Sequence, residues 1–146
     1  MTEKNIEIRE IAKVDDDLIA AMNLLIPQLS NSSPPPDRSV LEEIVASDSS
    51  ILISAYIDGA IVGSLTLIIF TIPTGKRAWI EDVVVDEKCR NEGIGEALNQ
   101  EAINIARRSG AKTVDLTSRP SREAANRLYS RLGFVQRNTN IYRFEI

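Results

Sequence analysis

The sequence contains no histidine and a single cysteine, Cys89, among its 146 residues. The absence of histidine excludes histidine-based triads, histidine metal sites and any histidine general base. One cysteine excludes an intrachain disulfide and a cysteine cluster for zinc. Neither a metal centre nor a histidine-dependent mechanism is therefore expected.

Long hydrophobic runs are also absent. No apolar stretch is long enough to cross a bilayer, and residues 1–10 are polar and charged, without the apolar core of a signal peptide. We therefore expect a cytoplasmic protein with no membrane partner. Apolar residues make up 43% and charged residues 26% of the chain, as in ordinary soluble proteins. This length suits one domain covering residues 1–146.

Acidic and basic side chains are unevenly distributed, and the net charge is −4. Residues 1–102 hold 8 Lys and Arg against 18 Asp and Glu, whereas residues 103–146 hold 9 against 3. The basic third could receive a polyanion and the acidic remainder could attract a cation, but two solvated faces explain the pattern equally well. Nucleic acid is not an expected partner, because the pI is near 4.9 and basic and aromatic residues are not interleaved.

Hydrophobic periodicity predicts the element order β-α-α-β-β-β-α-β-α-β-β. Asp58-Gly59 between two apolar runs is a strong hairpin signal, and the Pro-rich residues 30–36 read as a flap between two short helices rather than a domain boundary. The second helix is expected to bury Val40, Leu41, Ile44 and Val45, and Ser121 is expected to cap the last helix. The predicted strands are 6–11, 50–57, 60–70, 77–85, 113–117, 134–137 and 141–146, and the predicted helices are 15–29, 38–47, 93–109 and 121–132.

The most informative segment is the glycine loop between a valine-rich strand and a helix, Arg90-x-x-Gly93-x-Gly95. Outward-facing loop amides and the positive end of the helix dipole make such a loop a phosphate cradle, and glycine lets the backbone approach an anion closely. Dinucleotide-binding and P-loop patterns fit worse, because Leu98 stands where a third glycine would be needed and no Gly-Lys-Ser/Thr follows.

The order of elements and three sequence features resemble the GNAT family, the GCN5-related N-acetyltransferases. The features are the Arg90-x-x-Gly93-x-Gly95 loop, the preceding strand from Ile80 to Asp86, and the helix Asn126-Arg-Leu-Tyr129 that runs into Leu-Gly-Phe134. The resemblance implies an α/β (α+β) fold. Its mixed, mostly antiparallel sheet has about seven strands, is flanked by four helices and is splayed at the central parallel pair. It also implies acetyl-CoA as cosubstrate and an amine acceptor.

The resemblance also implies residue roles in holding the cosubstrate. Main-chain amides of the loop are expected to surround the pyrophosphate, with Arg90 either contacting phosphate or pinning the loop. Valine backbone groups of the splayed strand are expected to pair with the pantetheine arm, in addition to the valines' role as core residues. The predicted cosubstrate-binding residues are Val83, Val84, Val85, Arg90, Asn91, Glu92, Gly93, Ile94, Gly95, Glu96 and Asn126. For Asn126 the alternative is a solvated helix residue.

Two side chains are predicted to act in catalysis. By resemblance, Tyr129 is the general acid that protonates the departing thiolate, although its helical spacing also fits a packing residue. Glu81 could deprotonate an ammonium through water or hold it as a counter-ion. Asp82, water alone, or pairing of Glu81 with Arg77 or Lys76 are the alternatives. Alternation along the strand would send Glu81 and Asp82 to opposite faces. Cys89 is read as a spectator. Arg122, Arg127 and Arg131 are candidates for the 3′-phosphate or simply surface.

The sequence therefore predicts an N-acetyltransferase that transfers acetyl from acetyl-CoA to a primary amine. The acidic N-terminal region favours a small amine or amino-acid-like metabolite as the acceptor. A protein N-terminus is the second choice, and a non-catalytic acyl-CoA-binding sensor is an alternative of a different class. A homodimer is compatible with this reading.

Overall fold

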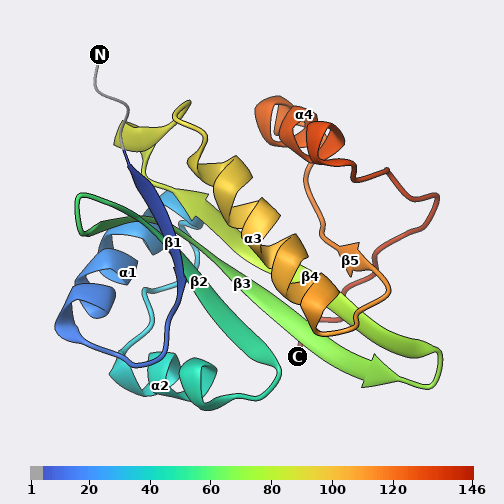
Figure 1. The fold of residues 1–146 in the computed structure, drawn as a ribbon, viewed down its shortest axis with the longest axis horizontal. Coiled ribbons are helices and arrows are strands. Elements are labelled where there is room, and N and C mark those ends of the chain that lie inside the picture. The colour runs from blue at the N-terminus through green and yellow to red at the C-terminus, as the bar shows by residue number, and fades with distance from the viewer. Residues whose placement is uncertain (1–4) are drawn as a thin grey trace.

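A computed structural model describes residues 5–146 as a five-stranded sheet, in the order β1-β2-β3-β4-β5, with helices on both faces. Helix α3 crosses one face, and α1 and α2 cover the other (Figure 1). The first three pairings are antiparallel and β4–β5 is parallel. The elements are β1 (Ile6–Glu10), α1 (Asp16–Leu29), α2 (Arg38–Ala46), β2 (Ser50–Ile57), β3 (Ala60–Ile72), β4 (Gly75–Val85), the 3₁₀ turn η1 (Glu87–Cys89), α3 (Ile94–Arg108), β5 (Val114–Asp115) and α4 (Glu123–Leu132).

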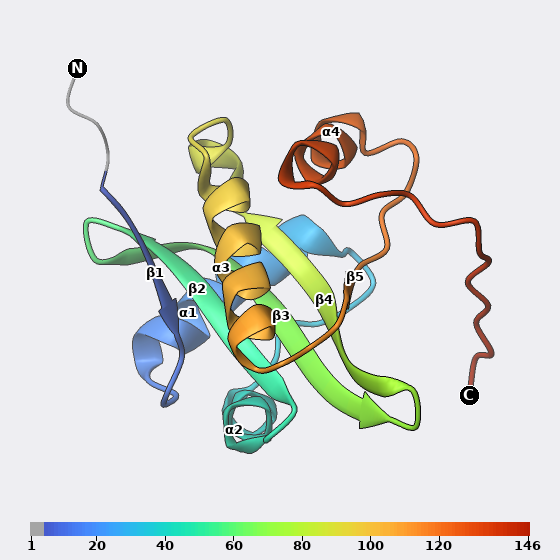
Figure 2. The same ribbon diagram turned by 45° about the vertical axis from the view of Figure 1, so that its right-hand side comes forward.

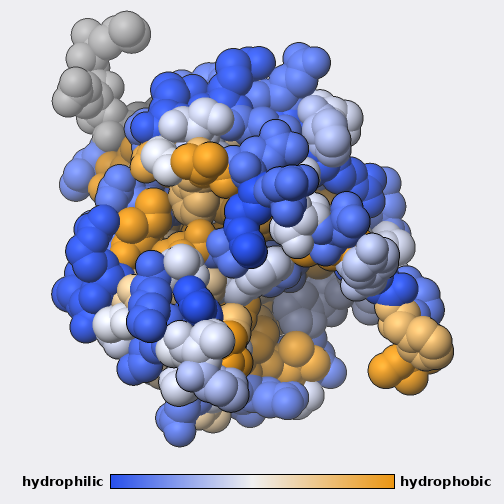
Figure 3. All heavy atoms as spheres, turned by 90° about the vertical axis from the view of Figure 1, so that its right-hand side faces the viewer, coloured by the Kyte–Doolittle hydropathy of each residue, from blue (hydrophilic) through white to orange (hydrophobic). Residues whose placement is uncertain are grey.

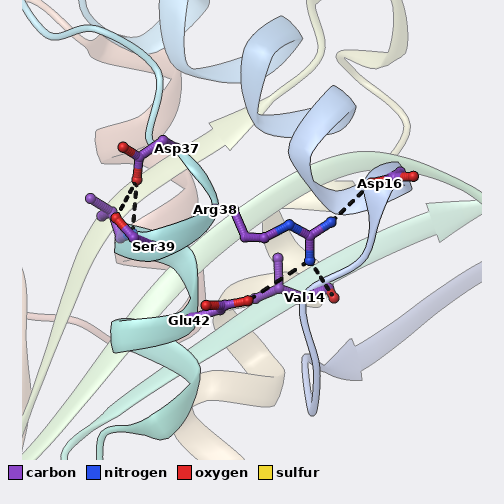
Figure 4. A network of polar contacts seen from close by, with 7 residues as sticks. Val14, Asp16, Asp37, Arg38, Ser39 and Glu42 are labelled. Atoms are coloured by element: carbon purple, nitrogen blue, oxygen red, sulfur yellow. Dashed lines mark hydrogen bonds and ion pairs between the residues drawn. The ribbon is translucent and has the colours of Figure 1, made fainter.

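Aspartates begin both N-terminal helices. The Asp15 carboxylate accepts a hydrogen bond from the Leu18 amide at 2.9 Å, and Asp37 accepts one from Val40 at 3.0 Å. Each bond satisfies an amide that has no acceptor within its own helix. Arg38 joins the two helix starts, because its guanidinium donates to the Asp16 carboxylate at 2.9 Å (Figure 4). These contacts hold the start of α2, where the 30–37 connection ends, against the start of α1.

The hydrophobic core has one part on each face of the sheet. Under α3, Leu65 and Leu67 of β3 pack against Leu98, all with no exposed surface. Under α1 and α2, Leu18 and Leu41 lie against β2. The predicted burial of Val40 is wrong, since its side chain is 43% exposed. Helix α2 is short and turns one narrow stripe inward, so Leu41 alone of its residues is fully buried.

The β2–β3 hairpin forms as predicted. Asp58 and Gly59 both have positive φ, 51° and 80°, as a two-residue turn with the twist of a hairpin requires. The next hairpin is longer than predicted, because β3 and β4 remain paired as far as Ile72 and Gly75. The predicted strands 60–70 and 77–85 leave a turn over 71–76 between them, but only Pro73 and Thr74 separate the two strands.

A β-bulge interrupts β4 at Asp82. Glu81 pairs with Thr66 and Val84 pairs with Ser64, so Asp82 and Val83 together lie opposite a single residue of β3. Asp82 has a φ of 53°, a left-handed conformation that is uncommon outside glycine. Ala78 and Ile80 pack under α3 before the bulge, and Val83 and Val85 do so after it. The bulge therefore reverses which residues of β4 face α3.

The C-terminal region differs most from the prediction. Residues 134–137 and 141–146 form no strand, so the sheet has five strands rather than about seven, and β5 is reduced to two residues. A strand requires backbone partners alongside it, and this segment leaves the sheet instead (Figure 2). Ser121 does not cap α4, whose preceding residue is Arg122 and lacks a side-chain capping bond. Within residues 5–146, no helix is long and apolar enough to span a membrane.

Candidate active site

The parallel pair β4–β5 is joined over a short distance and then separates. Ala78 pairs with Val114 and Trp79 with Asp115, and the Ala78 amide donates to the Thr113 carbonyl at 2.9 Å. Beyond Trp79, no described strand lies along this side of β4, so its last six residues present main-chain groups at a free edge. The expected splay of the central pair is therefore present. Such an edge is a template for an extended ligand.

The free edge leads directly into the glycine loop. Gly93 immediately precedes α3 with φ of 82°, and no side chain caps the helix. Asn91 is also left-handed, with φ of 66°. Left-handed residues in a turn make successive amides converge, and a helix start adds free amides and partial positive charge. A Cβ placed on Gly93 would meet nothing within 4 Å, so the space on the side-chain side of Gly93 is open. The arrangement fits a bound anion.

Side chains that the sequence analysis did not single out hold this loop in place. Gln28, near the end of α1, accepts a hydrogen bond from the Glu87 amide at 2.9 Å. Asp86 is buried and accepts from the Lys88 amide at 3.2 Å. Inside α3, fully buried Asn99 donates to the Gly95 carbonyl at 2.8 Å. Of these, only Asn99 carried a signal in the sequence: a polar residue beside Leu98 on the apolar face of a predicted helix.

Helix α4 lies against the start of α3 at Gly95. A Cβ built on Gly95 would lie 3.4 Å from Leu128 Cδ2 and 3.9 Å from Val85 Cγ2. The end of β4, the loop and α4, which are distant in sequence, therefore meet at this position. Tyr129, the next residue of α4, consequently lies on the element that closes over the loop.

Tyr129 and Asn126 line a cleft of about 860 Å³ between α4, β5 and the C-terminal segment. In Figure 3, which views this side of the molecule, hydrophobic atoms are exposed within a hollow. Tyr129 is 7% exposed, and its ring meets Phe134 edge-on with centroids 5.9 Å apart. Burial raises the pKa of the Tyr129 phenol above its ordinary value, and the nearby Arg122 charge opposes this increase. The phenol therefore remains protonated at neutral pH.

Asn126 is anchored by its own helix start. Its side-chain amide donates to the Arg119 carbonyl at 3.0 Å and ties the 119–122 turn to α4. This contact uses the NH₂ group of the Asn126 side chain. Because that group has a fixed partner, the orientation of the side-chain carbonyl oxygen is fixed too, and Asn126 lines the cleft.

Glu81 is exposed and held by an aromatic neighbour. The indole Nε1 of Trp79 donates to the Glu81 carboxylate at 2.7 Å. The alternative pairings with Arg77 and Lys76 do not form, because Arg77 donates to Thr74 and Lys76 to the Ser109 carbonyl. Trp79 also lines the cleft, so the Glu81 carboxylate is hydrogen-bonded to a residue of the cleft wall. The bulge interrupts the expected alternation, and Asp82 is exposed as well.

The predicted site residues thus fall into three neighbouring groups. Val83, Val84 and Val85 lie on the free edge of β4, and Glu81 stands just before them. The loop group has Arg90, Asn91 and Glu96 exposed, Glu92 and Gly95 half-buried, and Ile94 in the core under α3. Tyr129 and Asn126 form the third group on α4. Cys89 is half-buried against the core and belongs to none of them.

Comparison with known proteins identifies relatives of this fold. The chain is 35% identical over 99 residues to the uncharacterized N-acetyltransferase YhdJ of Bacillus subtilis, covering 65% of this chain and 68% of that protein. A transcriptional regulator from Bacillus halodurans superposes with a TM-score of 0.79 and 27% identity, over 97% of this chain and all of the other. An aminoglycoside N-acetyltransferase in complex with CoA superposes with a TM-score of 0.80 and 18% identity, over 97% and 95% of the two chains.

The family assignment rests on residues 18–134, which match the model of the acetyltransferase (GNAT) family. The matched range runs from α1 to Phe134 and so includes the β4 edge, the glycine loop and α4. The match confirms the resemblance seen in the sequence, and with it acetyl-CoA as the expected cosubstrate. The chain therefore belongs to the acetyltransferase (GNAT) family and is an acetyl-transferring enzyme.

Proposed function

We propose that this enzyme transfers the acetyl group of acetyl-CoA to the primary amine of a small metabolite. The observation that carries the proposal is the continuity of the free β4 edge with the uncapped start of α3. An extended thiol arm attached to a pyrophosphate needs this combination, a strand edge that ends in an anion-binding helix start.

The binding residues follow from that geometry. Amides of residues 90–96 contact the pyrophosphate, and the main chain of Val83, Val84 and Val85 pairs with the pantetheine amides. Ser118, on the opposite side of the splay, supports this placement. Its Oγ is buried, lines the cleft and has no hydrogen-bond partner among the described residues, so an amide-bearing ligand would satisfy it. Asn126 supplies an oriented carbonyl oxygen nearby.

The chemistry requires an oxyanion donor and a proton source. Because the bulge places two residues opposite one, the main chain at Asp82–Val83 leaves the regular ladder, and the Val83 amide is the donor to the thioester oxygen. The amine attacks the carbonyl carbon, the C–S bond breaks, and the Tyr129 hydroxyl gives its proton to the sulfur. Glu81 accepts the proton that the ammonium loses, directly or through water, and Trp79 positions its carboxylate.

A cationic small acceptor is favoured by the carboxylates on the β4 edge. Glu81 and Asp82 are both exposed there, and the indole bond holds one Glu81 oxygen in place. The second candidate is a protein N-terminus, and the shape of the 30–37 connection around the acceptor would decide between the two. The third candidate is a sensor that binds acyl-CoA without turnover. The observation in its favour is the 27% identity to a protein described as a transcriptional regulator.

The test is an amine-dependent thiol-release assay with purified protein and acetyl-CoA. Small amines, amino acids and short peptides with free N-termini are supplied one at a time, and free CoA is followed. Release with small amines but not peptides supports the proposal, and release with peptides alone assigns a protein N-terminus. Tight binding of acetyl-CoA with no release for any acceptor identifies a sensor and contradicts the proposed reaction.

A further inference from the structure

Three large apolar side chains on the β3–β4 hairpin are left out of the hydrophobic core. Ile68 and Phe70 of β3 and Trp79 of β4 are half-buried, and among residues 5–146 none of them belongs to the core on either face of the sheet. Ile68 lies directly opposite Trp79, and Phe70 follows two residues later on the same face. Together these three side chains form one apolar surface, the β3–β4 shelf.

The helices leave the shelf uncovered. Leu67 packs under α3, so by alternation Ile68 and Phe70 point to the other face, on the side of α1 and α2. Helix α2 packs on β2, and α1 covers the far end of the hairpin, where Gln28 reaches Glu87 just beyond β4. Figures 1 and 2 both show the hairpin running out past these two helices. An uncovered apolar surface beside polar groups is where a ligand packs.

Groups of opposite charge stand at the two ends of the shelf. Glu81 follows Trp79 by two residues on β4, and the indole donates to its carboxylate at 2.7 Å. At the other end, Arg77 lies opposite Phe70 and donates to the Thr74 hydroxyl at 3.3 Å. One ammonium group is attracted to the Glu81 end, whereas a second ammonium farther along the shelf would approach the Arg77 guanidinium. The surface therefore suits a single positive charge attached to an apolar body and disfavours a polycation.

We propose that the acceptor is a primary monoamine with an aromatic or bulky aliphatic body, and that Ile68 and Phe70 select it. The inference rests on the proposed function, because it takes the amine nitrogen to lie beside Glu81. Ile68 is two residues, about 7 Å, beyond Thr66, which is the cross-strand partner of Glu81. That span matches the reach of the ring in a phenylethylamine. A ring placed there removes apolar surface of both partners from water, whereas an amino sugar or a polyamine does not.

The test compares kcat/KM for four amines, with the full chain and saturating acetyl-CoA. Phenylethylamine carries the amine and the ring, ethylamine carries the amine alone, and spermidine and glucosamine represent polycationic and polyhydroxylated acceptors. Phe70→Ser removes apolar contact from the shelf, and Phe70→Leu retains it. Ile72→Ser is the matched control, because Ile72 is 41% exposed on the same strand but lies beyond the shelf, at the end of the hairpin. Calorimetry with acetyl-CoA checks that each variant is intact.

We expect phenylethylamine to exceed the other three amines by about tenfold or more in kcat/KM. In Phe70→Ser its advantage over ethylamine should fall on the order of tenfold, through KM, because a contact between two apolar rings is lost. Phe70→Leu and Ile72→Ser should keep most of that advantage. The rate with ethylamine and the Kd of acetyl-CoA should be the same in all variants.

Three results would overturn the proposal in different ways. Equal losses for phenylethylamine and ethylamine in Phe70→Ser would mean that the ring serves folding and not the choice of acceptor. A wild type that prefers spermidine or glucosamine also contradicts the inference, but leaves the proposed acetyl transfer to a small amine in place. If acetyl-CoA binds and no amine releases CoA, the proposed function fails and this inference fails with it.

Discussion

The contact between Trp79 and Glu81 gives the carboxylate a fixed orientation on an otherwise exposed strand. Glu81→Gln should lower kcat/KM for the amine at neutral pH by about a hundredfold, the usual contribution of a general base, with acetyl-CoA affinity unchanged. Trp79→Phe keeps an aromatic ring but loses the donor, so a smaller loss, roughly tenfold, is expected. Rates measured against pH with saturating acetyl-CoA check both.

The double variant distinguishes positioning from an independent role of the indole. If Trp79 acts through Glu81, then Trp79→Phe should cost nothing in the Glu81→Gln background. An equal loss in both backgrounds would mean that the ring contacts the acceptor itself. Asp82→Asn serves as the matched carboxylate control, and a loss confined to it would move the base to Asp82.

Tyr129 is nearly buried, and its ring packs against Phe134, so Tyr129→Phe preserves the packing and removes one oxygen. If the hydroxyl protonates the thiolate, kcat should fall by about a hundredfold or more with the Kd of acetyl-CoA near the wild-type value. The loss should shrink for acyl donors whose leaving thiol is more acidic. A neutral effect on rate would leave Tyr129 as a core residue.

The raised pKa of Tyr129 also predicts a stability change at high pH. The unfolded phenol ionises near 10.0, whereas burial keeps the folded phenol protonated to a higher pH. The native state then binds more protons than the unfolded state, so stability falls as the pH rises above about 10. Chemical denaturation between pH 8 and about 11 should show a shallower alkaline decline for Tyr129→Phe than for the wild type. Parallel declines would contradict the assigned burial effect.

The two glycines of the α3 loop have different structural tasks. Gly93 has a left-handed φ of 82°, whereas Gly95 has an ordinary helical conformation and leaves room for a Cβ in contact with Leu128. Gly93→Ala should cost about 1 kcal/mol of folding stability through backbone strain, whereas Gly95→Ala meets ordinary contacts and should cost less. Gly93→Asp and Gly95→Asp should both abolish acetyl-CoA binding, because each adds a negative charge beside the pyrophosphate.

Calorimetry with acetyl-CoA checks these glycine variants, and circular dichroism confirms that each is folded. Glu87→Asp, an exposed acid beside the loop, is the control that changes side-chain length without adding charge. Unchanged acetyl-CoA affinity in a folded Gly93→Asp variant would remove the loop from the binding site.

Local signals in the sequence predicted the elements that are determined locally. The Asp58-Gly59 turn and the four helices each depend on a few neighbouring residues, and the structure contains them all. The bulge at Asp82 was not predictable, because it depends on how β3 and β4 pair. The sequence of β4 itself does not reveal the bulge, because a run of valines suits a regular strand and a bulged strand equally well.

The alternation of apolar and charged residues predicts two C-terminal strands, but these segments pair with no strand of the sheet. Residues 141–146 alternate as a strand should, yet whether such a segment pairs depends on a neighbouring edge that a single sequence does not specify. The sequence predicts the proposed site only in outline. The loop and Tyr129 follow from local motifs, and the bond from Trp79 to Glu81 joins neighbouring residues of one strand, whereas Gln28 reaches the loop from α1, 59 residues away in the sequence.

Across the molecule, charge and shape separate the two sides of the proposed reaction. Five of the basic residues after position 102 lie at α4 or on the C-terminal segment, namely Arg122, Arg127, Arg131, Arg137 and Arg143, and the acidic pair Glu81–Asp82 lies on the β4 edge. This distribution suits a phosphate-bearing donor on one side and a cationic acceptor on the other. Acetyl-CoA binding should therefore weaken with added salt, which titration at two ionic strengths would measure.

The most direct test of the account is a product measurement in one reaction. Purified enzyme is mixed with isotopically labelled acetyl-CoA and an amine found in the release screen, and the acetylated amine and free CoA are quantified by mass spectrometry. We predict that the two appear in equal amounts, that the label is on the amine nitrogen, and that Glu81→Gln and Tyr129→Phe slow both equally. Acetyl-CoA that binds at the loop but yields no acetylated amine would contradict the account.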